Sequence, residues 1–223
     1  MRLTALILAL ALPLAPVLAQ DYAPPKAGLT IKYQSWRGAD TDPAMRTPLP
    51  PLTVEIRAVE GDNAMTRLLE DGRLVSSNMT LRGIFTHRAA SEDYETRLTG
   101  DQGPIRLLWP FVAGGTAEVR VEQSDREVAA VGEKEWKPTG RIFVYRFRVE
   151  GEEQITLPAG QFQTWVIARE VVFVIADGAR TRVEVSRTWF APALGWWVKF
   201  EHRAPEGTGT RLTVREAERV TGN

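Results

Sequence analysis

Apolar and polar residues alternate along most of this chain, and a period of two predicts β-strands. Apolar side chains recur at every second position in four segments, Leu29–Tyr33, Leu52–Ala58, Phe143–Val149 and Trp196–His202. A longer run from Phe162 to Ala176 is rich in β-branched and aromatic residues. No segment of helical length has apolar residues at the three- and four-residue spacing of an amphipathic helix. The pattern therefore predicts an antiparallel all-β protein.

Turn signals separate these segments at short intervals. Asp71-Gly72 and Asp177-Gly178 each follow a strand-like run, and this dipeptide favours a two-residue hairpin turn. Gly61-Asp62-Asn63 predicts another reversal. About a dozen strands result, which is more than a flat open sheet usually contains. We expect a curved antiparallel sheet forming a half-barrel or open barrel, with a β-sandwich as the alternative.

The first residues have the features of a secretory signal peptide. Arg2 precedes an apolar run from Leu3 to Leu12, and Val17-Leu18-Ala19 forms a cleavage site before Gln20. The apolar run is shorter than the roughly 20 residues of a membrane-spanning helix, so we expect a chain that does not span the membrane. Because the chain has no cysteine, a lipoprotein anchor is excluded. The predicted location is the bacterial periplasm or the exterior.

The mature chain divides into two parts of different composition. Residues 20–51 are rich in proline and contain one predicted strand near Ile31, and residues 38–51 are expected to form an irregular loop. Residues 52–223 are predicted to form a single antiparallel β domain, since one domain suits a chain of this size.

Composition removes several classes of function. The 28 basic and 28 acidic side chains balance, so the charge that nucleic-acid binding requires is missing. Arginine accounts for most of the basic residues, and we expect it on solvated strand faces. The absence of cysteine excludes disulfides and thiolate metal sites. No motif for a metal or a cofactor is present, and neither is predicted.

The sequence also lacks a recognisable catalytic motif. Its two histidines, His87 and His202, stand in no metal-binding spacing. We expect His202 to be a hydrogen-bonded structural residue. Glu201 and His202 could form an acid–base pair of a hydrolase, but neighbouring strand residues point to opposite faces. No catalytic residue is assigned.

The seven tryptophans are the remaining candidates for a binding site. They could fill the core of a curved sheet, or they could form a sugar-stacking platform or the lining of an apolar cleft. Because adjacent strand residues face opposite ways, either Trp196 or Trp197 is expected to leave the core. The candidate binding residues are Trp109, Trp165, Trp189, Trp196 and Trp197.

Three segments resemble bacterial secreted domains of unknown function, including the TapB-like group, over about residues 105–203. The segments are Leu108-Trp109-Pro110-Phe111-Val112-Ala113-Gly114, Leu157-Pro158-Ala159-Gly160-Gln161-Phe162-Gln163-Thr164 and residues 188–201, which begin Thr188-Trp189-Phe190-Ala191-Pro192. Phe111 stands where leucine is usual in that pattern and Phe190 where tyrosine is usual. The resemblance implies an envelope-associated β-protein and supplies no site residues.

The sequence therefore predicts an exported non-catalytic β-protein that binds an apolar or amphipathic ligand, such as a lipid, or a component of the cell envelope. The alternatives are a carbohydrate- or cell-wall-binding module with exposed tryptophans and, last, a hydrolase. The sequence does not identify the ligand or the oligomeric state.

Overall fold

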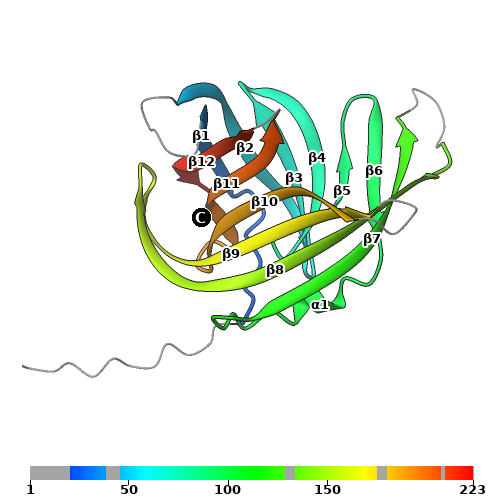
Figure 1. The fold of residues 1–223 in the computed structure, drawn as a ribbon. Helices are drawn as coiled ribbons and strands as arrows, with labels where there is room; N and C mark the ends of the chain where they lie inside the picture. Colours follow the sequence, from blue (N-terminus) through cyan, green and yellow to red (C-terminus); the bar gives the residue numbers. More distant parts are fainter. Residues whose placement is uncertain (1–20, 39–45, 129–133, 175–179, 207–208, 223) are drawn as a thin grey trace, which may run out of the picture.

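The structure is a computed structural model that describes residues 21–38, 46–128, 134–174, 180–206 and 209–222. In these ranges the chain forms one short helix and twelve strands in a closed barrel (Figure 1). The elements are β1 (Thr30–Gly38), β2 (Thr47–Glu60), β3 (Asn63–Glu70), β4 (Arg73–Leu81), β5 (Phe85–Ala90), β6 (Tyr94–Thr99), α1 (Gly103–Arg106), β7 (Thr116–Glu127), β8 (Lys137–Leu157), β9 (Gly160–Val174), β10 (Arg180–Ala191), β11 (Trp196–Glu206) and β12 (Gly209–Thr221).

The prediction of an antiparallel all-β fold is confirmed, and the curved sheet closes on itself. Each strand pairs with its neighbours in sequence, and β1 closes the ring against β12 in an antiparallel register that places Thr30 opposite Thr221. Closure pairs both edges of the sheet. The predicted signal peptide, residues 1–19, and the predicted Asp177-Gly178 turn lie outside the described residues.

The turn between β3 and β4 confirms the prediction from its dipeptide. Glu70 pairs with Arg73 across a two-residue loop. Both loop residues have positive φ angles, 48° at Asp71 and 77° at Gly72. A type I′ turn requires these angles, and its twist matches that of the flanking strands.

The predicted loop over residues 38–51 is wrong in its second half. Residues 47–51 belong to β2, where Leu49 pairs with Ser35 and Pro48 with Trp36 of β1. A register shift between Tyr33 and Ser35 interrupts this ladder, and proline is tolerated in strands at such irregular positions. The proline-rich segment is therefore part of the barrel wall. Residues 39–45 lie outside the described part.

Two large hydrophobic clusters fill the molecule, and a third, small one contains Val144, Val172 and Val174. The first joins the N-terminal strands to the tip of the long β8–β9 hairpin, where Ala159 N donates a hydrogen bond to Ala217 O of β12 at 3.1 Å. Its buried members are Leu29, Ile31, Tyr33, Leu52, Val54, Ile56, Ala64, Leu157, Val166, Trp189, Ala191, Trp196, Val198 and Ala217. The second cluster contains Leu81, Phe85, Ile105, Leu108, Phe111, Ala117, Val119, Val121, Phe147, Val149, Ile167 and Phe190.

The segment around α1 closes one end of the barrel. Ile105, Leu108 and Phe111 insert from this segment into the second cluster, and Figure 1 shows α1 below the ends of the surrounding strands. Phe111 packs against Phe190 with ring centroids 5.6 Å apart. These side chains therefore fill the lumen at this end of the barrel.

An N-terminal strap, residues 21–28, covers the same end from outside. Tyr22 packs its ring against Trp109, with centroids 5.4 Å apart and a T-shaped geometry. The backbone of Ala23, Pro24 and Pro25 lies directly against Gly195 in the β10–β11 turn. The strap therefore belongs to the packed structure. No helix among the described residues is long and apolar enough to cross a membrane.

Candidate functional site

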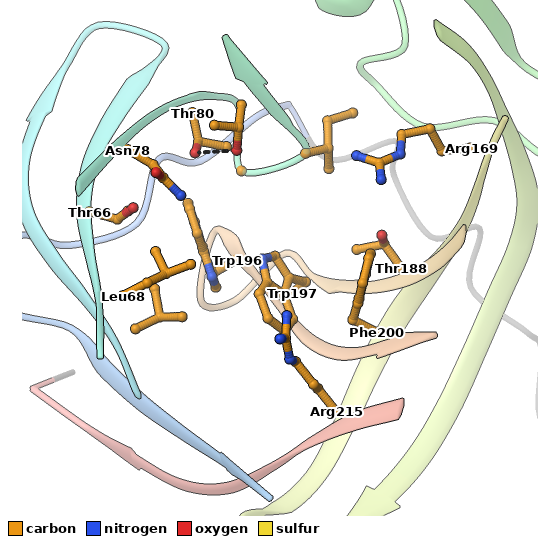
Figure 2. A pocket seen from close by; sticks show the side chains of 14 residues that line it. Thr66, Leu68, Asn78, Thr80, Arg169, Thr188, Trp196, Trp197, Phe200 and Arg215 are labelled. Atoms are coloured by element: carbon orange, nitrogen blue, oxygen red, sulfur yellow. Dashed lines mark hydrogen bonds between the residues drawn. The ribbon is translucent and has the colours of Figure 1, made fainter. Parts of the chain in front are cut away.

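A cavity of about 150 Å³ lies in the lumen between two opposite groups of strands (Figure 2). Its lining comes from β2 to β5 on one side and from β9 to β12 on the other. Aromatic rings, hydroxyl groups and two arginines share the lining, which consists of Val54, Thr66, Leu68, Asn78, Thr80, Gly83, Ile84, Thr86, Arg169, Thr188, Trp196, Trp197, Phe200 and Arg215. A twelve-stranded barrel is wide enough for its side chains to leave such a space.

Trp196 and Trp197 both line this cavity, so the prediction that one of them leaves the core is wrong. Trp196 is 3% exposed, and Trp197 is half-buried. The β10–β11 ladder shifts register between Trp189 and Phe190, so that Phe190 pairs with Trp197. The skipped residue is Val198, so Trp196 and Trp197 still pair in order with Ala191 and Phe190. Trp196 is the first residue of β11 and lines the cavity from the end of the strand, beside the turn at Gly195.

Aromatic rings form one wall of the cavity. Trp197 stacks on Tyr33, with ring centroids 4.3 Å apart, and lies 5.7 Å from Phe200. Phe200 in turn stacks on His202 at 6.2 Å. Burial raises the pKa of Tyr33 well above its usual value, while the neighbouring Trp196 indole and Arg215 act in the opposite direction. The wall is therefore apolar and holds a neutral phenol.

Arg215 brings a positive charge to this wall. Phe200 and Arg215 are cross-strand partners, so they share the lumen face. Among the described residues its ion-pair partner is Glu70, whose Oε1 lies 4.0 Å from Nη2. The Nε atom is buried and has no hydrogen-bond acceptor in the described chain. Burial lowers the pKa of Arg215, and this effect outweighs the opposing influence of Glu70 and Tyr33.

Arg169 faces the lumen from β9 and has a close partner. Its Nη2 donates to Glu184 Oε1 at 2.7 Å, and the other carboxylate oxygen of Glu184 lies 2.8 Å from His202 Nε2. Burial acts to raise the pKa of Glu184, but His202 and Arg169 outweigh it and hold the pKa below its usual value. This cluster confirms that His202 is a hydrogen-bonded residue.

Several polar atoms at the cavity lack a partner within the described chain. They include Asn78 Oδ1, Arg169 Nε and Arg215 Nε, all of them buried. Buried polar atoms without a partner are uncommon, because each one costs the free energy of its lost hydration. A group that supplied donors and acceptors here would therefore be stabilised.

Three of the predicted binding tryptophans lie elsewhere. Trp109 and Trp165 both pack against Phe111, at 4.2 and 5.8 Å, near the closed end of the barrel. Trp189 is 7% exposed, and its indole N–H donates to Glu153 Oε2 at 2.8 Å. Lys199 lies 4.7 Å from its ring. The structure therefore brings together only Trp196 and Trp197 from the predicted set.

The two remaining tryptophans form no platform either. Trp36 lies beside Arg46 at 5.1 Å, and Trp136 lies beside Arg97 at 4.4 Å and Arg126 at 4.6 Å. All seven tryptophans are described, and each is buried or half-buried. The flat row of exposed rings that a sugar-binding surface uses is not formed in the described structure.

The Glu201–His202 pair considered for a hydrolase does not form. Glu201 instead contacts Lys199 and Arg203, with N–O distances of 3.4 Å in both cases. Neither a carboxylate nor an imidazole is among the described residues that line the cavity. The described part of the chain also contains no group of three or more acidic or histidine side chains that could hold a metal ion.

Arg169, Arg215 and Asn78 were missed by sequence reasoning, which placed arginines on solvated faces. Arg169 nonetheless carries a signal, because it is in phase with Trp165, Ile167 and Val171, which are buried or half-buried. An arginine on an otherwise apolar strand face points to a buried charge. Arg215 gives no such signal, since the alternating apolar residues before it, Leu212 and Val214, lie on the opposite strand face.

These features define a closed β-barrel protein with a small aromatic and cationic cavity in its lumen. No known protein family and no curated protein matches the sequence of this chain. Its fold is similar to that of the hypothetical lipoprotein YmcC from Escherichia coli (K12), with 11% identity, a TM-score of 0.46 and 83% of each chain covered. A Bacteroides fragilis protein with a YmcC-like fold gives 10% identity and a TM-score of 0.44 over 91% of this chain and 99% of that chain.

A candidate lipoprotein from Parabacteroides distasonis is similar at the same level, with 10% identity and a TM-score of 0.43 over 90% of this chain and 98% of that chain. At these scores the likenesses say nothing about what the cavity binds. The resemblance of residues 105–203 to the TapB-like group stays a prediction.

Proposed function

We propose that this chain is an exported, non-catalytic binding protein that holds a small amphipathic ligand in the lumen of its barrel. The observation that carries the proposal is the cavity itself, where a wall of Trp197 and Phe200 lies next to buried polar atoms without partners. Apolar walls with a few polar groups are typical of small-molecule sites. The signal-peptide pattern supports export to the periplasm or the exterior.

The size of the cavity narrows the class of ligand. An engineered protein cavity of about 150 Å³ binds benzene, and the lumen cavity has the same volume of about 150 Å³. Typical sites for larger ligands measure roughly 300–1,000 Å³. The cavity is partly open and fits a compound with one benzene-sized apolar part, whereas a whole lipid would extend beyond it.

The lining also supports a binding role without catalysis. General acid–base chemistry needs a group that titrates near neutral pH. The lining residues that the structure describes are apolar, hydroxyl, amide, indole and guanidinium groups, and none of these titrates in that range. Ser186 pairs with His202 across the strands, but it is 1% exposed and does not line the cavity.

Native mass spectrometry of mature protein purified from its own cell envelope without detergent tests this proposal. We expect a bound small molecule that is lost in Thr188→Phe, because the larger side chain fills the cavity. Thr116→Phe places the same side chain at an exposed position outside the cavity and serves as the control. Absence of any bound molecule, together with no binding of benzene-sized probes to the purified protein, would refute the proposed function.

A further inference from the structure

The geometry points to a small amphipathic monocarboxylate as the ligand of the lumen cavity, with Arg215 binding its carboxylate. This inference rests on the proposed function, because it names the chemical class that the same cavity takes. Two observations support it. One of the two lumen arginines has a close acidic partner and the other does not, and the aromatic wall lies beside the second.

The two arginines differ in how their charges are balanced. Arg169 donates to Glu184 at 2.7 Å, within normal hydrogen-bond distance. Arg215 faces Glu70 at 4.0 Å, and the Glu70 side chain is 45% exposed, so water screens this pair. A largely buried guanidinium with such a distant partner favours the arrival of an anion. The lumen therefore has one positive charge without close compensation.

The free atoms of Arg215 suit a carboxylate in shape. Its Nε has no acceptor in the described chain, and Nη2 has only the distant contact with Glu70. Nε and Nη2 lie on one side of the planar guanidinium and match the two oxygens of a carboxylate. Because neighbouring atoms cover Nε, the guanidinium has to turn this edge toward the cavity to make both hydrogen bonds.

The apolar part of the ligand would lie against the rings of Trp197 and Phe200. Arg215 pairs with Phe200 across β11 and β12, and both residues line the cavity. Figure 2 shows the Arg215 side chain next to the Trp197 ring, with Arg169 on the far side of the cavity. A short apolar group joined to a carboxylate would thus contact the rings and the guanidinium together.

The charge balance argues against a dianion. One guanidinium without a close partner compensates one negative charge. A second negative charge on the ligand would have no free cation among the described lining residues to balance it. Arg169 already pairs with the Glu184 carboxylate, which also contacts His202. Burying an uncompensated charge is costly. A phosphate monoester is therefore expected to bind more weakly than a carboxylate of the same size.

Isothermal titration calorimetry with three matched probes at pH 8 tests this inference. The probes are phenylacetate, its neutral analogue phenylacetamide, and phenyl phosphate, which is dianionic at this pH. We expect phenylacetate to bind at least about tenfold more tightly than either of the others, because a hydrogen-bonded charge contributes more than a neutral pair. Equal binding of phenylacetate and phenylacetamide would overturn the inference and leave the proposed function standing. If none of the three probes binds, the result counts against both the monocarboxylate inference and the proposed function.

Two variants locate the carboxylate. Arg215→Gln is expected to lose the preference for phenylacetate over phenylacetamide while phenylacetamide still binds. Arg146→Gln changes an arginine on the outer face, which pairs with Glu118 at 2.8 Å, and should leave both affinities unchanged. An unchanged preference in Arg215→Gln would overturn the assignment. If that variant does not fold, Arg215→Lys decides the same point: it keeps the charge but loses the planar pair of donors, so it should weaken the binding of phenylacetate and leave that of phenylacetamide unchanged.

Discussion

Tyr33 and Trp197 are linked twice, through their rings and through a hydrogen bond. The rings stack with centroids 4.3 Å apart and an interplanar angle of 25°. The Tyr33 hydroxyl also donates to the backbone carbonyl of Trp197 at 2.7 Å. Because Tyr33 lies on β1 and Trp197 on β11, the pair crosses the lumen face of the strand between them, β12. It therefore fixes the aromatic wall of the cavity.

Replacing Tyr33 by phenylalanine keeps the stacked ring and removes the hydroxyl. We expect Tyr33→Phe to lower the free energy of unfolding by about 1 kcal/mol, because a buried carbonyl loses its donor. Denaturation in urea measures the change. Tyr94→Phe is the matched control, since Tyr94 is 57% exposed and its loss of a hydroxyl should have almost no effect. Equal effects in the two variants would show that the Tyr33 hydrogen bond contributes nothing.

Gly195 permits the close approach of the N-terminal strap to the β10–β11 turn. Its φ is 63°, and an added Cβ would lie 2.5 Å from both the Ala23 carbonyl oxygen and the Pro25 nitrogen. Gly195→Ala should therefore displace the strap and lower the midpoint temperature of thermal unfolding. Gly140→Ala is the control, because Gly140 has a similar φ of 70° but no atom lies within 4 Å of an added Cβ. It should carry only the backbone cost of about 1–2 kcal/mol, and a smaller effect at Gly195 than at Gly140 would contradict the steric explanation.

Glu184 holds Arg169 and His202 together, so its carboxylate should contribute to stability. Glu184→Gln leaves the partly buried Arg169 without its charged acceptor and is expected to cost about 1–3 kcal/mol. Chemical denaturation at pH 7 measures this loss. Glu118→Gln also removes an arginine partner, but the Glu118 side chain is 58% exposed, so its effect should be close to zero. The proposed contribution is wrong if the two substitutions are equivalent.

The stability of the barrel should fall as the pH drops below about 6.5, the ordinary pKa of histidine. Burial lowers the pKa of His87, and the neighbouring Arg88 and Arg106 lower it further. In this window the unfolded chain gains a proton at His87 that the folded chain does not, which favours unfolding. His87 Nε2 lies 3.0 Å from Asn63 Oδ1, a contact that glutamine can keep. His87→Gln should therefore reduce the slope of unfolding temperature against pH between pH 7 and pH 5.5. An unchanged slope would show that His87 does not cause it.

Local patterns predicted the strands and turns well, because each depends on neighbouring residues. The Asp71-Gly72 turn follows from the ability of these two residues to adopt positive φ. Closure of the sheet could not be predicted in this way. It depends on the pairing of Thr30 with Thr221, two residues at opposite ends of the described chain whose local sequences do not indicate that they meet.

The cavity was predictable only in part, since strict alternation places neighbouring strand residues on opposite faces. Trp196 and Trp197 were both among the candidate binding residues, but alternation gave no sign that two neighbours would line one cavity. Trp109 and Trp165 are equally aromatic, and only the fold shows that they belong to the closed end.

The pairing of β1 with β12 also determines the order in which the barrel can form. The pairing of Ile31 with Val220 joins the first strand of the described chain to the last. One edge of β1 therefore stays without a partner until β12 has been synthesised. Such distant contacts slow folding, because the entropy of closing a long loop is lost before the contacts form. During that interval the exposed edge can pair with other chains, so a protein of this topology depends on being kept apart from its copies until its last strand arrives.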